Sequence, residues 1–289
     1  MTRTTNYLKT ALLLGLLTGL ILLLGGLLGG RTGVLIAFVF AALVNFGSYW
    51  FSDKIVLRMY GAQAVTPEQA PRLHAIVDRL VARAGLPKPA LYLIPEAAPN
   101  AFATGRNPQH AAVAVTQGML QGMDEEEVEG VIAHELAHVR NRDILIASVA
   151  ATIAGAVSML GHFAQWGAIA GGMGGRHAQG NEEQRGGHPI ILLVAALLAP
   201  IAAFIIQMAI SRSREYAADA TGARIAGSPH GLARALEKLG ALNQRVPMRH
   251  GDPATSQLFI VAPLSGGAML QLFSTHPPLQ ERIRRLRGY

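Results

Sequence analysis

Two histidines four residues apart, with a glutamate directly after the first, form the pattern in this chain that could most readily do chemistry. They are His134, Glu135 and His138, within the run GVIAHELAHV. Positions i and i+4 lie on one face of a helix, so both imidazoles can reach a single ion. Glu135 lies about 100° further round the helix and faces whatever is beside that ion. This spacing is typical of a catalytic zinc site.

A catalytic zinc site needs three protein ligands and an open fourth position, so the two histidines are incomplete. The chain has no cysteine, which leaves His, Asp and Glu to supply the third ligand. Glu215 is the best candidate, because it is on a predicted helix directly after a long apolar run. Asp219 follows one turn later and could accept a hydrogen bond from a ligand histidine. The alternative is that Glu215 and Asp219 form a solvated face with the neighbouring arginines.

Four apolar runs predict a membrane protein. Hydrophobic residues make up 51% of the 289 residues and charged residues only 15%, which is unusual for a soluble protein. Residues 8–29 and 34–50 are predicted to form a hairpin of two spans, and runs 144–170 and 189–210 are each long enough to cross a bilayer. A cleaved signal peptide is the alternative for the first run, and core helices of a soluble domain are the alternative for the last two.

The predicted fold class is mainly α: a four-span helical membrane protein with a cytosolic zincin-like (gluzincin) α+β catalytic domain carrying a small sheet. Residues 8–51 form the first hairpin and 52–143 the first cytosolic segment. Residues 144–210 hold spans three and four with a polar loop at 171–188, and 211–289 form the second cytosolic segment. Most basic residues that flank the runs fall on one side, which the positive-inside rule places in the cytoplasm. The net charge is +7, but the basic residues are scattered beside the apolar runs and form no patch, so we expect no nucleic-acid binding.

Local signals place the histidine pattern on a helix. Asp124 followed by Glu127 predicts a capping box that opens it. An earlier amphipathic helix is predicted to start at a cap on Thr66 and to end at Gly85. Strands are predicted at 90–94 and 111–115, with an edge strand at 100–105 between them. Further helices are predicted up to residue 226, over 229–243 and at the basic C-terminal end.

The chain resembles the HtpX-type membrane zinc metalloproteases, relatives of the CAAX prenyl proteases, over essentially its whole length. Four motifs in the expected order carry the resemblance: NAFATG at 100–105, HELAHVRNRD at 134–143, REYAAD at 214–219 and STHPP at 274–278. The resemblance implies a zinc-dependent endopeptidase of the bacterial cytoplasmic membrane. It also implies that the active site faces the cytosol and that the substrates are damaged or misfolded membrane proteins.

The resemblance also assigns roles to residues. By motif position, His134 and His138 correspond to the family's histidine ligands and Glu215 to its glutamate ligand. Glu135 corresponds to the catalytic base that activates water. One Zn²⁺ per chain is therefore expected.

The edge strand and one loop histidine each have two possible roles. Asn100, Ala101 and Phe102 resemble an edge strand that holds a peptide by strand addition, although an ordinary turn is the alternative. His276 could contact the substrate or stabilise an oxyanion, or it could be a structural loop residue. Three other histidines near the polar loop are assigned no zinc role: His162, His177 and His188.

Two other functions stay open at this stage. One is a more selective regulatory or prenyl-peptide protease, distinguished by a requirement for a lipidated C-terminal motif. The other is a non-catalytic membrane scaffold or chaperone that keeps zinc for structure. Glu135 argues against the scaffold, because a structural site gains nothing from an unligated carboxylate. The physiological substrates and the oligomeric state do not follow from the sequence.

Overall fold

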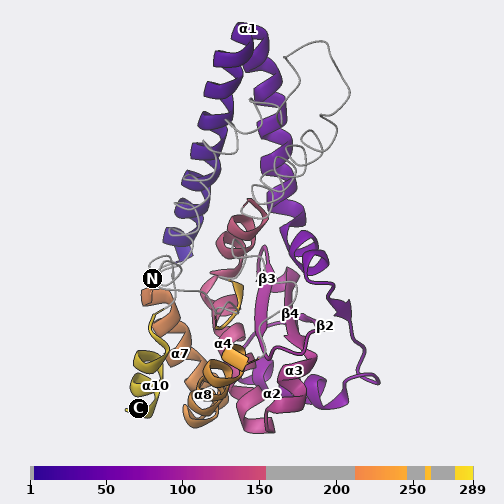
Figure 1. Ribbon diagram of the computed structural model, residues 1–289, viewed down its shortest axis with the longest axis vertical. Coiled ribbons are helices and arrows are strands. Elements are labelled where there is room, and N and C mark those ends of the chain that lie inside the picture. Colours follow the sequence, from indigo (N-terminus) through magenta and orange to yellow (C-terminus); the bar gives the residue numbers. More distant parts are fainter. Residues whose placement is uncertain (1–2, 154–211, 246–257, 262–276, 289) are drawn as a thin grey trace, which may run out of the picture.

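The computed structural model describes residues 3–153, 212–245, 258–261 and 277–288. A long helical hairpin extends from a mainly helical part that contains a small sheet (Figure 1). The start of the hairpin and the last helix both lie at the end that holds the sheet. The predicted combination of a mainly helical chain with a small sheet is confirmed.

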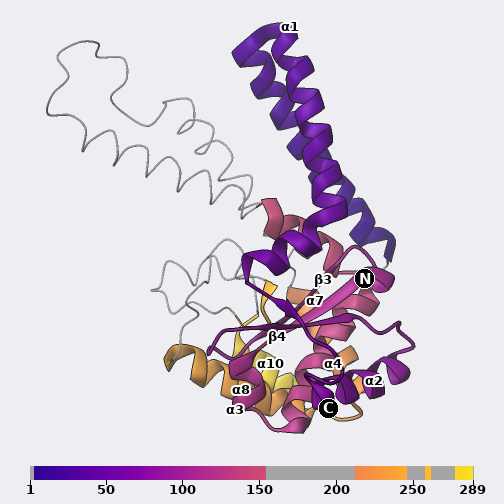
Figure 2. The same cartoon turned by 90° about the vertical axis from the view of Figure 1, so that its right-hand side faces the viewer.

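Helix α1 (Arg3–Met59) doubles back on itself at two glycines (Figure 2). Gly29 and Gly30 leave the helical backbone, and Gly30 has a φ of 55°, a left-handed conformation that glycine adopts without strain. Asn45 Nδ2 then donates a hydrogen bond of 2.7 Å to Thr18 Oγ1 across the two arms. The predicted hinge between the first two apolar runs is thus confirmed.

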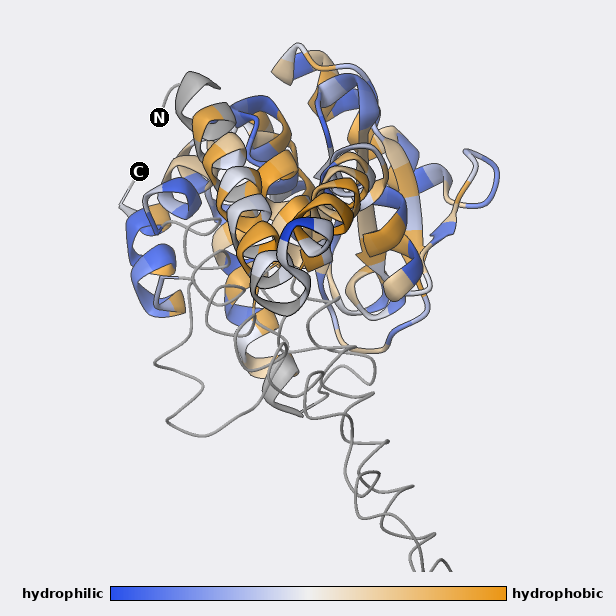
Figure 3. Ribbon diagram, turned by 90° about the horizontal axis from the view of Figure 1, so that it is seen from above, coloured by the Kyte–Doolittle hydropathy of each residue, from blue (hydrophilic) through white to orange (hydrophobic). Residues whose placement is uncertain are grey.

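Apolar side chains face outward along α1. All of the exposed large hydrophobic side chains among the described residues belong to this helix, and Leu35, Ile36 and Leu43 are each at least 65% exposed. The hairpin is mostly orange and white in Figure 3, whereas the outer helices of the other part carry much blue. Exposed apolar surface of this extent marks a membrane or partner contact.

Within the described residues, Gly29–Met59 is the one helix long and apolar enough to cross a membrane. Thr10–Leu23 is a shorter apolar helix, and Ile144–Ile153 begins where the third run was predicted. The rest of that run, the polar loop and the fourth run fall within 154–211, outside the described residues. Four spans and a cytosolic orientation therefore stay predictions.

The sheet is mixed and has the strand order β1-β2-β4-β3. β2 pairs parallel with β4, whereas β1 and β3 pair antiparallel with their neighbours, so β3 is an edge strand of the sheet as predicted. The boundaries of the three predicted strands are confirmed to within one residue, whereas β1 was not predicted. The strands are β1 (Gln63–Ala64), β2 (Ala90–Ile94), β3 (Ala101–Gly105) and β4 (Ala111–Thr116).

Helix α2 (Pro71–Ala84) starts later than predicted. Thr66 was expected to cap it, but the Thr66 N–H donates to Gln69 Oε1 at 2.9 Å within a turn that precedes the helix. Pro71 then opens the helix, because proline fits the first helical position. At the other end Gly85 adopts a φ of 64° and ends the helix as predicted.

Helix α4 (Glu125–Asn141) is central to the non-hairpin part, because it packs against β3, α7 and α8. Its side chains Val131, Ile132 and Leu136 are fully buried. Besides the apolar helix at Ile144–Ile153, further helical elements in the described part of the chain are η1 (Pro108–His110), α3 (Gln117–Gly122), α7 (Arg212–Ala226), α8 (His230–Arg245) and α10 (Leu279–Arg287).

The contact between α4 and α8 leaves no room for a side chain at Gly130. A Cβ there would lie 2.4 Å from the backbone nitrogen of Leu232. Alanine gains about 1 kcal/mol in helix propensity over glycine, but overpacking against backbone costs about 1–3 kcal/mol. Gly130→Ala is therefore expected to lower the melting temperature of the detergent-solubilised protein.

Gly122→Ala is the matched control, because its Cβ would meet only Leu242 Cδ1 at 3.8 Å. This variant should melt at or slightly above the parent temperature. A Gly130→Ala protein that melts with the parent would contradict the tight packing of α4 on α8.

Candidate metal centre

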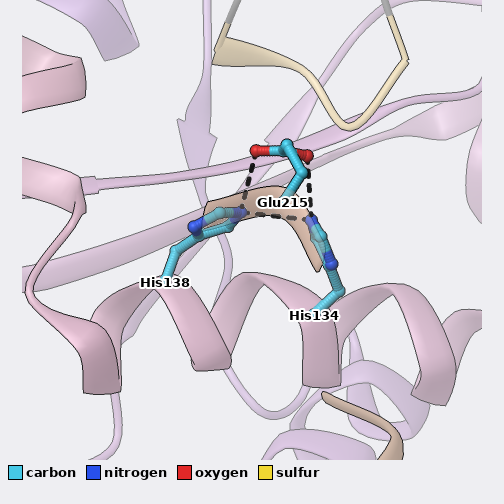
Figure 4. Close-up of side chains that lie close together, drawn as sticks. All are labelled: His134, His138 and Glu215. Carbon is cyan, nitrogen blue, oxygen red and sulfur yellow. Dashed lines mark hydrogen bonds and ion pairs between the residues drawn. The ribbon is translucent and has the colours of Figure 1, made fainter. Parts of the chain in front are cut away.

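The predicted capping box fixes the start of α4. Asp124 accepts from the Glu127 N–H and Glu127 accepts from the Asp124 N–H, both at 2.9 Å, so that prediction is confirmed. Two turns further along, His134 and His138 rise from one face of the helix (Figure 4). Their Nε2 atoms are 3.1 Å apart. The helix therefore presents two nitrogens at a single point.

Helix α7 brings Glu215 to the same point. Its Oε1 is 3.6 Å from His138 Nε2, and its Oε2 is 3.8 Å from His134 Nε2 (Figure 4). A close contact between the helices allows this approach: a Cβ on Gly222 would lie 3.0 Å from the backbone nitrogen and Cα of His134. Residues 77 to 81 positions apart in the sequence thus share one site.

These three side chains fit a metal ion. One ligand atom from each of His134, His138 and Glu215 lies within 4.8 Å of the others, and all three groups are buried or nearly so. Two imidazole nitrogens with one carboxylate oxygen are the donors of many catalytic zinc sites, which leave the fourth position open. Among the described residues they form the one cluster of this kind. The structure thus brings together the three predicted ligands.

A carboxylate lies behind each histidine. His134 Nδ1 is 2.9 Å from Asp219 Oδ1, a short contact whose angle departs from that of a regular hydrogen bond. His138 Nδ1 is 3.3 Å from Asp143 Oδ2. Such carboxylates orient a ligand imidazole so that its other nitrogen faces the metal. A contact between Asp219 and a ligand histidine was predicted from the sequence, whereas no role was predicted for Asp143.

The two imidazoles differ in their electrostatic surroundings. Burial lowers the pKa of His134, with the charge of Arg282 acting in the same direction. For His138, burial is outweighed by Asp143 and by the charges of Glu215 and Glu135, which together raise its pKa to about 9. Without metal, His138 therefore holds a proton at neutral pH. A metal ion must displace this proton, since only neutral imidazole is a ligand.

Glu135 lies beside the three predicted ligands and is not one of them. Its side chain is 3% exposed, and it interacts electrostatically with His138 and Glu215. Burial raises its pKa to about 8, although a hydrogen bond with the Ala103 backbone acts in the opposite direction. A carboxyl group with a pKa near neutrality can both accept and donate a proton during a reaction.

Edge strand β3 runs beside Glu135, and residues from another part of the chain lie along its start. The Ile260 N–H donates to the Ala101 carbonyl at 3.2 Å, and Asn100 Nδ2 donates to the Val261 carbonyl at 2.8 Å. The Phe102 ring points into the core instead, 5.3 Å from the ring of Phe259 between centroids. Further along β3, the Ala103 backbone hydrogen-bonds Glu135, and the Gly105 N–H donates to Ser148 Oγ at 3.3 Å.

Several histidines named in the sequence analysis lie outside the described residues. They are His162, His177, His188 and His276. The predicted role of His276 therefore stays a prediction, and so does substrate binding by the edge strand, because the structure contains no substrate.

Sequence reasoning missed Arg282, which contacts two of the predicted ligands, His134 and Glu215. Its guanidinium donates two hydrogen bonds to Asp219, at 2.9 and 2.7 Å. A signal was present, because Arg282 stands between Leu279 and Ile283 on the apolar stripe of α10, where a charge is unexpected. A buried charge of this kind requires a specific partner.

The contact between Asp143 and His138 leads to a prediction for metal affinity. Asp143→Asn removes the charge that holds the His138 ring, so it should weaken zinc binding by about 10- to 100-fold. Competition with a chromophoric chelator measures this affinity. Asp78→Asn, which alters an exposed pair with Lys88 at 2.8 Å, should leave it unchanged. Equal zinc affinities of the Asp143→Asn and Asp78→Asn proteins would show that the contact between Asp143 and His138 does not support zinc binding.

The comparisons with known proteins agree with this geometry. The model of peptidase family M48 matches residues 67–289. A protease HtpX homolog from Desulforapulum autotrophicum is 56% identical over 282 residues, which cover 98% of this chain and 89% of that protein. One from Syntrophobacter fumaroxidans is 57% identical over 280 residues, covering 97% and 98%. One from Pyrococcus furiosus is 50% identical over 281 residues, covering 97% and 95%.

Among solved structures, the crystal structure of S. mikatae Ste24p aligns with a TM-score of 0.49 and 18% identity. It covers 98% of this chain, which spans 66% of that protein. The relatives named HtpX align over nearly all of the chain, and the family match covers well over half of it. The chain therefore belongs to peptidase family M48, a family of metalloproteases, and is one of its HtpX homologues.

Proposed function

We propose that the chain is a zinc-dependent membrane endopeptidase that hydrolyses peptide bonds in misfolded or damaged membrane proteins. The observation that carries this proposal is the buried carboxylate of Glu135 beside the cluster of His134, His138 and Glu215. A site that served only to stabilise the fold would gain nothing from this additional carboxylate. The proposed cofactor is one Zn²⁺ held by the three clustered side chains.

The residues of the site have different roles in the proposed reaction. A bound Zn²⁺ would supply a Lewis acid that polarises the peptide carbonyl and acidifies water. Glu135 is placed to accept a proton from the attacking water and to return it to the departing amine. Burial supports this role, because it raises the pKa of Glu135 in the metal-free protein to about 8, well above the usual range of a carboxyl group. Asp143 and Asp219 hold the histidine rings in the orientation that ligation requires.

A peptide substrate is proposed to add to the edge of β3. Backbone groups of alternate residues of an edge strand face away from the sheet. Ala101 and Ala103 are on this outward side. The Ala101 carbonyl accepts a hydrogen bond from the Ile260 N–H, and the Ala103 backbone forms a hydrogen bond with Glu135. Because residues 258–261 already lie along Ala101 and the Gly105 N–H donates to Ser148, the proposed substrate strand pairs with β3 at Ala103. Its peptide bond would then pass close to Glu135.

The choice of membrane-protein substrates rests on the hairpin. The exposed apolar side chains of α1 indicate that the protein is anchored in a bilayer. The proposed location is the bacterial cytoplasmic membrane, multi-pass, with both termini and the active site in the cytosol. In support, the start of α1 and helix α10 lie at the same end of the molecule as the site.

Hydrolysis and its substrate preference can be tested together. The detergent-solubilised parent protein should cleave unfolded casein. This cleavage should stop when 1,10-phenanthroline is added and should return when zinc is restored. Cleavage of an unfolded membrane protein but not of its folded form would support the proposal. Cleavage that requires a prenylated C-terminal peptide would favour a selective protease, and no cleavage of any of them would favour a scaffold.

Glu135→Gln tests the proton-transfer role. It keeps the shape of the side chain but removes its basicity, so casein cleavage should fall by about 10²- to 10⁴-fold. Zinc content should stay at the parent level, because Glu135 is outside the ligand cluster. Glu126→Gln on the exposed side of α4 is the control and should cleave at the parent rate. A Glu135→Gln protein with parental activity would refute the assignment.

Glu215→Ala tests the third ligand instead. Two histidines alone hold zinc much more weakly, so the purified variant should lose most of its metal by elemental analysis. Glu237→Ala, which removes an exposed glutamate paired with Arg287, should keep parental zinc content. Unchanged zinc in the Glu215 variant would reject the role of Glu215 as a ligand.

A further inference from the structure

Arg282 is buried where a charge is costly. Its side chain is 1% exposed, and it is the largest fully buried side chain among the described residues. It comes from α10, whose Ile283 and Leu286 also face the core. A buried charge persists only when it is paired and fully hydrogen-bonded. The partners of Arg282 therefore indicate what it does.

Those partners are residues of the candidate metal centre. Arg282 Nε and Nη2 donate to the two carboxylate oxygens of Asp219 at 2.9 and 2.7 Å, a two-point contact. Nη1 lies 3.5 Å from Glu215 Oε2, and Nη2 lies 3.4 Å from His134 Nε2. Nη1 also donates to the Ile260 carbonyl at 2.9 Å.

This arrangement places one rigid group against two carboxylates of the site. Glu215 and Asp219 are one turn apart on α7, and the guanidinium contacts both from the side of α10. The same guanidinium holds Ile260, whose N–H bonds to Ala101 of the edge strand. Arg282 therefore links the ligand helix, the C-terminal helix and the strand beside Glu135.

We propose that Arg282 is a positioning residue that fixes Glu215 and Asp219 in the orientation needed for metal binding. It acts through these carboxylates and is not itself a ligand, since guanidinium has no lone pair to donate. The proposal rests on the metal site of the proposed function, but it does not depend on hydrolysis. It also gives the last helix of the chain a role in a site formed by α4 and α7.

A simpler role would be that of a counter-charge for the acidic cluster. The two roles predict opposite effects on metal affinity. A cation close to the site repels a divalent ion, so removing a plain counter-charge would strengthen zinc binding. Removing a positioning group would weaken zinc binding, because Glu215 and Asp219 would then adopt other orientations. The direction of the change therefore distinguishes the two roles.

The experiment compares Arg282→Gln and Arg282→Lys in the full-length protein. Zinc affinity is measured by competition with a chromophoric chelator, and the folding of the metal-free protein by thermal unfolding in detergent. Arg282→Gln should bind zinc about 10- to 100-fold more weakly than the parent. Arg282→Lys should show an intermediate loss, because lysine keeps the charge but cannot contact both oxygens of Asp219 in parallel.

Arg284→Gln is the matched control on the same helix. Its side chain is 77% exposed and pairs with Glu281, so its substitution should change neither zinc affinity nor unfolding. A parent that binds no zinc would refute the proposed function itself. With a zinc-binding parent, variants of Arg282 that bind as tightly or more tightly would overturn only the positioning role. Failure of both variants to fold without metal would also overturn it, because Arg282 would then serve the fold.

Discussion

The packing of α7 against α4 is the contact on which the candidate site depends. One helix carries His134 and His138 and the other carries Glu215, so neither helix alone offers three ligands. Gly222 lets the backbones approach, because any side chain there would meet the backbone of His134. Protein interiors are close-packed, so a shift of α7 would move Glu215 with it. The ligand geometry is thus set mainly by a backbone contact.

Charge is a second constraint on the same region. Glu135, Glu215 and Asp219 are all less than 9% exposed, and carboxylates buried together repel one another unless cations balance them. Arg282 supplies one positive charge, and a bound divalent ion would supply two. A core built only for stability would contain apolar side chains here, since a buried ionic cluster is often no more stable than its apolar replacement. The cluster is therefore better explained by chemistry than by stability.

The sequence predicted the local features of this site well. The helix with the histidine pair, its capping box and the strands around it all have strong local signals, such as hydrophobic alternation and turn residues. The predicted start of α2 was wrong by several residues, because Thr66 and Gln69 form a hydrogen-bonded turn that precedes the helix at Pro71. Boundaries depend on such competing short-range bonds.

The long-range contacts could not be predicted in the same way. Arg282 is 63 residues from Asp219 in the sequence, and no periodic pattern links them. Ile260 belongs to a short segment without helix or strand periodicity, so nothing in the sequence placed it beside Ala101. Glu215 was a candidate ligand from its place on a predicted helix after an apolar run, and the family resemblance assigned it the same role, but neither indicated these supporting residues. Pairings of this kind become visible only when the fold brings the segments together.

The segment 258–261 then constrains how a substrate could reach the edge of β3. Phe259 is fully buried, with its ring 4.9 Å from that of Tyr60 and 5.3 Å from that of Phe102 between centroids. Removing a buried phenylalanine from such a cluster costs about 1.5–3 kcal/mol in lost burial alone. A short peptide strand gains only about 1 kcal/mol for each hydrogen bond it forms, and the segment also keeps its bond to Arg282. In the proposed strand addition, the segment therefore stays in place and marks one end of the substrate strand.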